Sequence, residues 1–141
     1  MEKLTGDALV ENFQLFDDWE DRYAYIIDLS KQLAPMDAAL KNDQTKLDGC
    51  ISQVWITHDL FNDAQGIKRI HFNADSDAVL VKGLISLLLT LYQDSTPTEI
   101  LELPIEQIMT QIGLSSHLSV NRRNGFQSML SYINNTARNA S

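Results

Sequence analysis

The sequence of 141 residues has few side chains that could form a disulfide or bind a metal ion: Cys50 is its single cysteine, and it has three histidines. One cysteine forms no disulfide within the chain, and zinc or iron–sulfur sites need several Cys or His ligands at recurring spacings. We therefore expect no metal centre and no cofactor held by this chain. The scarcity of cysteine also favours a reducing, cytoplasmic setting.

Long apolar runs are missing as well. The longest, from Ala78 to Tyr92, contains Lys82 and falls short of the ~18 residues that a membrane span needs. The first residues lack the basic and then apolar layout of a secretory signal. We expect a protein that neither crosses a membrane nor enters the secretory route.

Basic residues are few, with 11 Lys and Arg against 19 Asp and Glu and a net charge of −8. A nucleic-acid-binding protein needs a basic surface to neutralise phosphates, so this class is not expected. The charges are uneven, however. Every acidic residue lies at or before Glu106, whereas residues 107–141 carry three arginines and no acid. This pattern predicts a small basic end on an acidic body.

What the chain does contain is a regular series of helix and strand signals, which predicts one domain over residues 1–141 of the α+β class. Apolar periodicity and capping residues, among them Thr5, Asp18 and Ser119, predict helices, and two β-branched or aromatic runs predict an antiparallel pair. We expect a small central antiparallel sheet flanked by helices, and a short third strand before Cys50 is compatible with the pattern. The expected helices cover residues 6–16, 19–33, 77–92, 97–103, 104–112 and 120 onward, and the expected strands cover 50–60 and 67–73.

The helix from about residue 77 to 92 is expected to be the most buried, because apolar residues cover nearly all of its sides. Asp75 or Ser76 is the expected N-cap of this helix. Thr96 and Glu99 form a capping-box pattern with proline at the first helical position. Gly113 is expected to end the following helix.

Cys50 follows Gly49 at the entry to a predicted strand. Glycine allows close approach of a partner, and functional groups concentrate at such junctions. Against this, Asp48 lies two residues away, and a nearby carboxylate disfavours the thiolate. A free cysteine is also often buried for packing alone. The residues by themselves therefore leave two roles open for Cys50, that of a nucleophile and that of a packing residue.

A thiol hydrolase would pair Cys50 with a base such as His58 or His71. Histidines at strand ends are commonplace, so this alternative has little support from the sequence. Arg122 and Arg123 fall in the first turn of the last predicted helix, where positive charge opposes the helix dipole. An acidic partner would account for them, and so would plain exposure to solvent.

Four stretches of the sequence stand out: GCxSxVW from Gly49 to Trp55, DSDAxxVKGL from Asp75 to Leu84, HLxxxRxxG from His117 to Gly125, and WEDRYAYII in the second helix. Together they resemble the SufE-like family of sulfur-acceptor proteins. Members of that family receive sulfur from cysteine desulfurases during iron–sulfur cluster assembly. Their fold is similar to that of the iron–sulfur scaffold proteins.

The resemblance implies that Cys50 carries a persulfide received from a pyridoxal-phosphate-dependent desulfurase, and that a cluster scaffold is the downstream recipient. It implies a contact with the desulfurase through Arg122, Asp75 and Asp48, and a supporting role in the cysteine loop for Gly49, Ser52 and Trp55. Such a chain is a partner and activator of an enzyme rather than an enzyme itself. The sequence leaves open the desulfurase system, the final sulfur recipient and homodimerisation. A non-catalytic interaction module with a structural Cys50 and, less favoured, the hydrolase remain alternatives.

Overall fold

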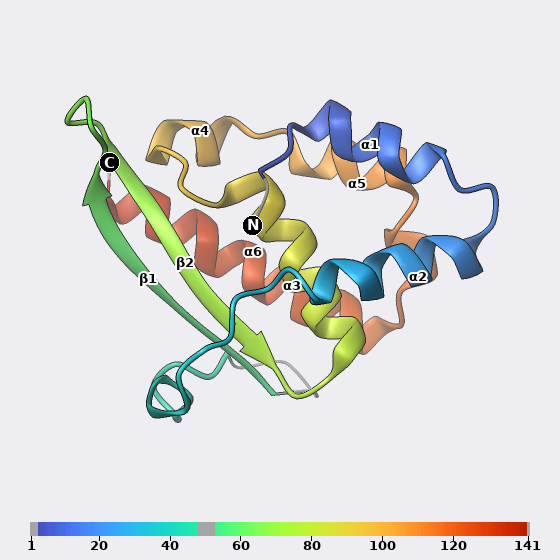
Figure 1. Ribbon diagram of the computed structural model, residues 1–141, viewed down its shortest axis with the longest axis horizontal. Coiled ribbons are helices and arrows are strands. Elements are labelled where there is room, and N and C mark those ends of the chain that lie inside the picture. The colour runs from blue at the N-terminus through green and yellow to red at the C-terminus, as the bar shows by residue number, and fades with distance from the viewer. Residues whose placement is uncertain (1–2, 48–52, 141) are drawn as a thin grey trace.

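The computed structural model describes residues 3–47 and 53–140 and shows helices gathered against a long two-stranded hairpin (Figure 1). The two strands are β1 (Val54–Asn62) and β2 (Lys68–Ser76). The α-helices are α1 (Gly6–Gln14), α2 (Trp19–Ser30), α3 (Val79–Tyr92), α4 (Pro97–Glu102), α5 (Ile105–Ile112) and α6 (Val120–Ala140), with short 3₁₀ turns η1 (Ala38–Leu40) and η2 (Ser115–His117). The α+β class, with an antiparallel sheet flanked by helices, is thereby confirmed.

β1 and β2 pair antiparallel over their whole length, from Val54 opposite Ser76 to Asn62 opposite Lys68. The tight connection is organised by Asp63, whose carboxylate accepts hydrogen bonds from the backbone amides of Gln65 and Ile67 at 2.9 and 3.0 Å. Gly66 adopts a φ of 76°, a conformation that L side chains rarely take. The turn expected between the two strands is therefore present, and it fixes the register of the hairpin.

α3 is the central helix, as expected, since every residue from Gly83 to Tyr92 is buried. α2 packs directly on it. The approach is close because Gly83 has no side chain: an added Cβ would lie 2.3 Å from the carbonyl oxygen of Ile26. One glycine thus sets the spacing between the two helices.

The remaining helices close the core around α3. α5 packs on α1, and α6 contacts both α3 and α4. The backbone amide of Leu4 donates to the carbonyl of Thr90 at 2.8 Å, which ties the start of α1 to the C-terminal end of α3. No described helix has both the length and the apolar character needed to cross a membrane.

Most of the expected helix ends are confirmed. Thr5 and Asp18 cap α1 and α2, and the capping box of Thr96 and Glu99 opens α4. Gly113 ends α5 with a left-handed φ of 76°. These ends depend on contacts within about four residues, which the sequence displays directly.

The expected cap of α3 is wrong. The helix begins at Val79, its N-cap position is Ala78, and no side chain caps it. β2 instead continues through Asp75 and Ser76, because the Asp75 carboxylate is engaged by lysines from other segments. Packing has therefore overridden a local capping signal.

Candidate functional site

The site predicted around Cys50 is only partly within the described residues. Asp48, Gly49, Cys50 and Ser52 lie outside them, so their predicted roles stay predictions. What the structure describes is the chain on either side, at Leu47 and at Gln53. The described neighbours Trp55, Asp75 and Arg122 complete the predicted set.

The chain before Cys50 lies along the edge of β1 that β2 does not occupy, where an isolated bridge takes the place of the possible third strand. The amide of Leu47 donates to the carbonyl of Val54 at 2.8 Å, and the amide of Ile56 donates to the carbonyl of Thr45 at 2.9 Å. Lys46 and Trp55 form the corresponding antiparallel bridge. The segment that carries Cys50 therefore leaves and rejoins the described structure at neighbouring points.

The chain after Cys50 is held by Asp77. The amide of Gln53 donates to the Asp77 carboxylate at 3.0 Å, and the amide of Asp77 donates to the carbonyl of Gln53 at 3.3 Å. This reciprocal contact joins the start of β1 to the turn between β2 and α3. Sequence reasoning missed it, because Asp77 sits in a stretch that resembles an ordinary helix start.

Asp75 lies at the centre of a buried ion-pair cluster. Its side chain is 8% exposed and pairs with the ammonium groups of Lys41 at 2.7 Å and of Lys82 at 3.5 Å. Its carboxylate also accepts the amide of Ser76 at 2.8 Å. Within the protein this carboxylate is engaged by two lysines, and its contact with a partner stays a prediction.

The pKa of Asp75 reflects these opposing influences. Burial is the largest single one and raises the pKa, since it disfavours the charged form. The hydrogen bonds from Lys41 and from the Ser76 amide, together with the charge of Lys82, outweigh burial, so the pKa lies below its usual value. Asp75 therefore stays ionised at neutral pH.

Trp55 belongs to the same cluster. It pairs with Asp75 across the hairpin, its side chain is half-buried, and the Lys41 ammonium lies 5.4 Å from its ring centroid. A cation over an indole face is attracted to the ring. Lys41 thus links the chain that leads to Cys50 with both Trp55 and Asp75, a role that the sequence did not signal.

Arg122 lies in the first turn of α6 and is exposed. Its amide donates to the Ser119 hydroxyl at 3.2 Å, which confirms Ser119 as the helix cap. Among the described residues, the guanidinium of Arg122 makes no hydrogen bond or ion pair. It is available to a partner.

The loop before Arg122 is fixed by α2. The rings of Trp19 and His117 stack with centroids 3.7 Å apart and planes at 14°, and the Tyr23 hydroxyl donates to the carbonyl of His117. Arg22 also donates to the carbonyl of Ile112 at 3.0 Å. The second-helix stretch and the stretch that contains Arg122, distant in sequence, are therefore in contact.

α6 runs beside β1 in the same direction (Figure 1). His58 Nδ1 lies 2.7 Å from the Tyr132 hydroxyl, and Lys68, paired with Asn62, donates to the carbonyl of Ala140 at 3.2 Å. The four-residue step from His58 to Asn62 in the strand thus covers about the same length as the eight-residue step from Tyr132 to Ala140 in the helix. This is expected, because a strand rises about 3.3 Å per residue and a helix about 1.5 Å. By the same ratio, the start of β1 lies level with about position 124 of α6. Arg122 is therefore at the end of the molecule where the chain after Cys50 enters β1.

A hollow of about 360 Å³ lies next to the bridge between Lys46 and Trp55. It contains the His58 and Tyr132 pair, and burial raises the pKa of Tyr132. None of the described residues that line it carries a carboxylate. Its lining residues are Gln44, Thr45, Lys46, Leu47, Ile56, Thr57, His58 and Tyr132.

The histidines do not form a common catalytic centre. His58 contacts Tyr132, whereas His71 Nδ1 lies 2.8 Å from the Asp94 carboxylate. Because His71 pairs with Asp59, the residue next to His58, the two histidines lie on opposite faces of the hairpin. Within the part of the chain that the structure describes, no group of three or more His, Cys, Asp or Glu side chains is arranged to hold a metal ion.

Comparison with known proteins gives matches of three kinds: a family model, related sequences and solved structures. The model of the SufE family, described as an Fe-S metabolism associated domain, matches residues 7–137. An uncharacterized SufE-like protein of Rhizobium meliloti is 36% identical over 131 residues, which are 93% of each chain. The solution structure of a hypothetical protein from Thermus thermophilus has the same fold, with a TM-score of 0.76 at 17% identity, over 99% of this chain and 98% of that one.

These matches span nearly the whole chain and agree with the stretches singled out in the sequence. The four stretches meet in two pairs that the structure describes: Trp55 beside Asp75, and Trp19 stacked on His117. The chain belongs to the SufE family, whose domain is associated with iron–sulfur metabolism.

Proposed function

We propose that this chain accepts sulfur on Cys50 from the persulfide of a cytoplasmic cysteine desulfurase, stimulates that enzyme, and passes the sulfur to an iron–sulfur scaffold. One observation carries the proposal most: the single cysteine of a SufE-family chain sits in a short segment whose two described ends, Leu47 and Gln53, are pinned by backbone hydrogen bonds. The pyridoxal phosphate belongs to the desulfurase, and this chain needs no cofactor of its own.

The transfer is a thiol–disulfide type of exchange. The Cys50 thiolate attacks the outer sulfur of the donor persulfide, a new S–S bond forms on Cys50, and the donor's S–S bond breaks. The donor cysteine leaves as a thiolate, so no oxidant or reductant is consumed. No base of this chain is assigned to the step, which makes deprotonation of Cys50 a task of the docked complex.

Arg122 supports the docking part of this proposal. Its guanidinium is exposed, has no partner among the described residues, and lies at the end where the Cys50 segment joins β1. An acidic group on the desulfurase would pair with it. The neighbouring Arg123 provides a matched control with the same charge on the same turn.

The test is incubation with a cysteine desulfurase and free cysteine, followed by intact mass without reductant and peptide mapping. We expect a gain of one sulfur atom confined to the Cys50 peptide, absent without desulfurase and absent in Cys50→Ser. A persulfidated desulfurase beside an unmodified chain would refute the proposal and return Cys50 to a packing role. Hydrolytic activity lost in Cys50→Ser would favour the hydrolase instead.

A further inference from the structure

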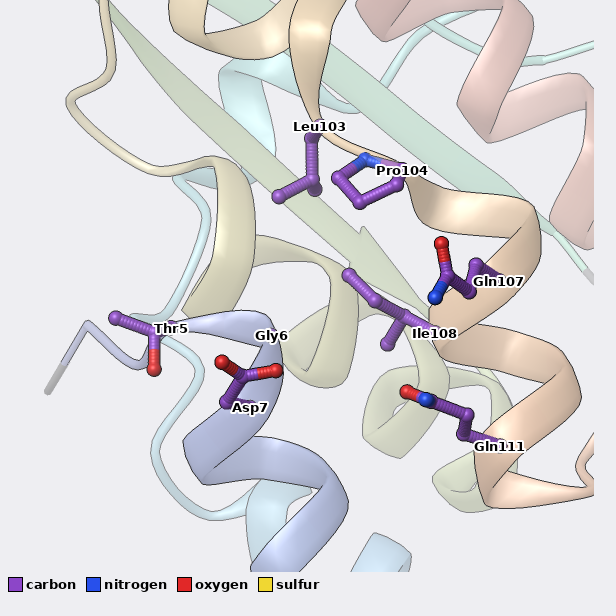
Figure 2. A pocket seen from close by; sticks show the side chains of 8 residues that line it. All are labelled: Thr5, Gly6, Asp7, Leu103, Pro104, Gln107, Ile108 and Gln111. Atoms are coloured by element: carbon purple, nitrogen blue, oxygen red, sulfur yellow. The ribbon is translucent and has the colours of Figure 1, made fainter.

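A second hollow, of about 240 Å³, lies between the N-terminal turn of α1 and the side of α5, including the chain that leads into α5 (Figure 2). Asp7 stands on the α1 side, and the amides of Gln107 and Gln111 stand one helical turn apart on the α5 side. Leu103, Pro104 and Ile108 supply the apolar part of the lining. We call this hollow the α1–α5 groove.

The groove is built on well-packed helices. Ile108 is 4% exposed and packs against Gly6, where an added Cβ would lie 2.6 Å from its terminal methyl carbon. The Leu4 amide also anchors the start of α1 to α3. The polar groups at the rim are therefore carried by a fixed frame, as a recognition site requires.

Among the described residues, the charges that line the α1–α5 groove or directly flank its lining are negative. Asp7 lines it, Glu11 follows one turn later on α1, and Glu102 and Glu106 directly precede lining residues. Among the described residues, none of these four carboxylates forms an ion pair. Lys3, the basic residue closest to Asp7 in sequence, donates instead to the Ser95 hydroxyl at 2.6 Å. A cationic occupant would meet acceptors and no competing cation in the lining.

We propose that the α1–α5 groove binds an arginine side chain presented by a segment of a partner protein. Its guanidinium has five donors in a planar fork, which suits the Asp7 carboxylate together with the amide oxygens of Gln107 and Gln111. Its aliphatic stem lies along Leu103, Pro104 and Ile108. Charge complementarity with an acidic protein selects the basic partner.

The α1–α5 groove is remote from the proposed sulfur-accepting segment. Asp77 holds Gln53 just before α3 begins, whereas Leu4 bonds to Thr90 near the other end of α3. Eleven residues separate Val79 from Thr90, which is about 16 Å of helix. A partner in the groove therefore leaves the Cys50 segment free for the desulfurase, and each site can be tested independently of the other.

The probe is the peptide acetyl-Gly-Arg-Gly-Arg-Gly-amide, titrated into ¹⁵N-labelled full-length protein at low salt and followed by amide chemical shifts. We expect saturable shifts centred on the side-chain amides of Gln107 and Gln111 and on the backbone amide of Gly6. Asp7→Asn should weaken binding about threefold or more. Asp17→Asn, an equal charge change at an exposed site outside the groove, should leave the affinity unchanged. Replacing both glutamines by leucine should also weaken binding at constant charge.

Equal weakening by Asp7→Asn and Asp17→Asn would overturn the proposal, because general attraction to an acidic protein would explain the binding. Shifts scattered over the surface without saturation would overturn it too. If free arginine binds as tightly as the peptide, the ligand of the groove is a small molecule and the proposal of a partner segment is wrong. All variants should still gain one sulfur on Cys50, so failure here is distinguishable from failure of the proposed function.

Discussion

Replacing Lys41 by methionine removes one of the two ammonium groups that neutralise Asp75 and keeps most of the apolar stem. The lost contacts are the 2.7 Å ion pair with Asp75 and the cation over the Trp55 ring. Lys82 at 3.5 Å and the Ser76 amide at 2.8 Å remain. The substitution therefore weakens the cluster without leaving a bare buried charge.

The loss of stability expected for Lys41→Met depends on how far the side chains of Asp75 and Lys41 are exposed to solvent. Breaking a fully buried ion pair costs about 3–5 kcal/mol, and a hydrogen bond to a charged group contributes about 1.5–3 kcal/mol. The Asp75 side chain is 8% exposed, but that of Lys41 is 29% exposed and Asp75 keeps two partners. We expect a loss of about 1.5 kcal/mol in the free energy of unfolding, or about 5 °C in Tm for a chain of this size.

The assay is urea unfolding followed by circular dichroism, with Lys31→Met as the matched control. Lys31 pairs with Asp28 at 3.5 Å, but the side chains are 78% and 70% exposed, so its loss should change stability by less than about 0.5 kcal/mol. A double-mutant cycle of Lys41→Met with Asp75→Asn should show coupling. Equal effects of Lys41→Met and Lys31→Met would refute the assignment of a stabilising buried cluster.

The pH dependence has a definite sign. Because the folded-state pKa of Asp75 is lowered, its stabilisation is present above the unfolded-state pKa, near 4, and is lost as the pH falls through the lowered value. The difference between the wild-type protein and Lys41→Met should therefore shrink below about pH 4. A difference that stays constant through that range would mean that the lost apolar packing, and not charge, was measured.

Further substitutions test the fold and the proposed docking. Gly83→Ala should cost about 3 kcal/mol in urea unfolding, because the new Cβ would lie 2.3 Å from the Ile26 carbonyl oxygen; unchanged stability would contradict the close packing of α2 on α3. Thr96→Ala should cost about 1 kcal/mol, because the Glu99 amide loses its 3.1 Å bond to the Thr96 hydroxyl; a neutral result would mean that water replaces the cap. Arg122→Ala should change stability by less than about 0.5 kcal/mol and reduce desulfurase stimulation more than Arg123→Ala does, and equal losses would remove its assignment as a docking residue.

The sequence by itself was sufficient for the elements whose ends depend on nearby residues. Thr5, Asp18, the Thr96 and Glu99 pair and Gly113 all occupy the positions expected of them. Such caps are contacts within about four residues, so the local sequence contains both partners. The burial of α3 was equally visible, since apolar residues cover nearly every side of that helix.

The sequence was insufficient where a side chain had a choice of partners. Aspartate is a good helix-capping residue, yet Asp75 pairs instead with Lys41, 34 positions earlier, and with Lys82. Asp77 holds Gln53, and Arg122 lies at the same end of the molecule as the start of β1. Both arrangements likewise depend on segments that are far apart in the chain.

Local chemistry therefore determined the helices, the hairpin and the family stretches, whereas tertiary packing decided which charges are buried and which are offered to a partner. The physical reason is desolvation. A carboxylate such as Asp75 enters the interior only where distant cations meet it, and a guanidinium such as that of Arg122 stays exposed where the described fold brings it no acid.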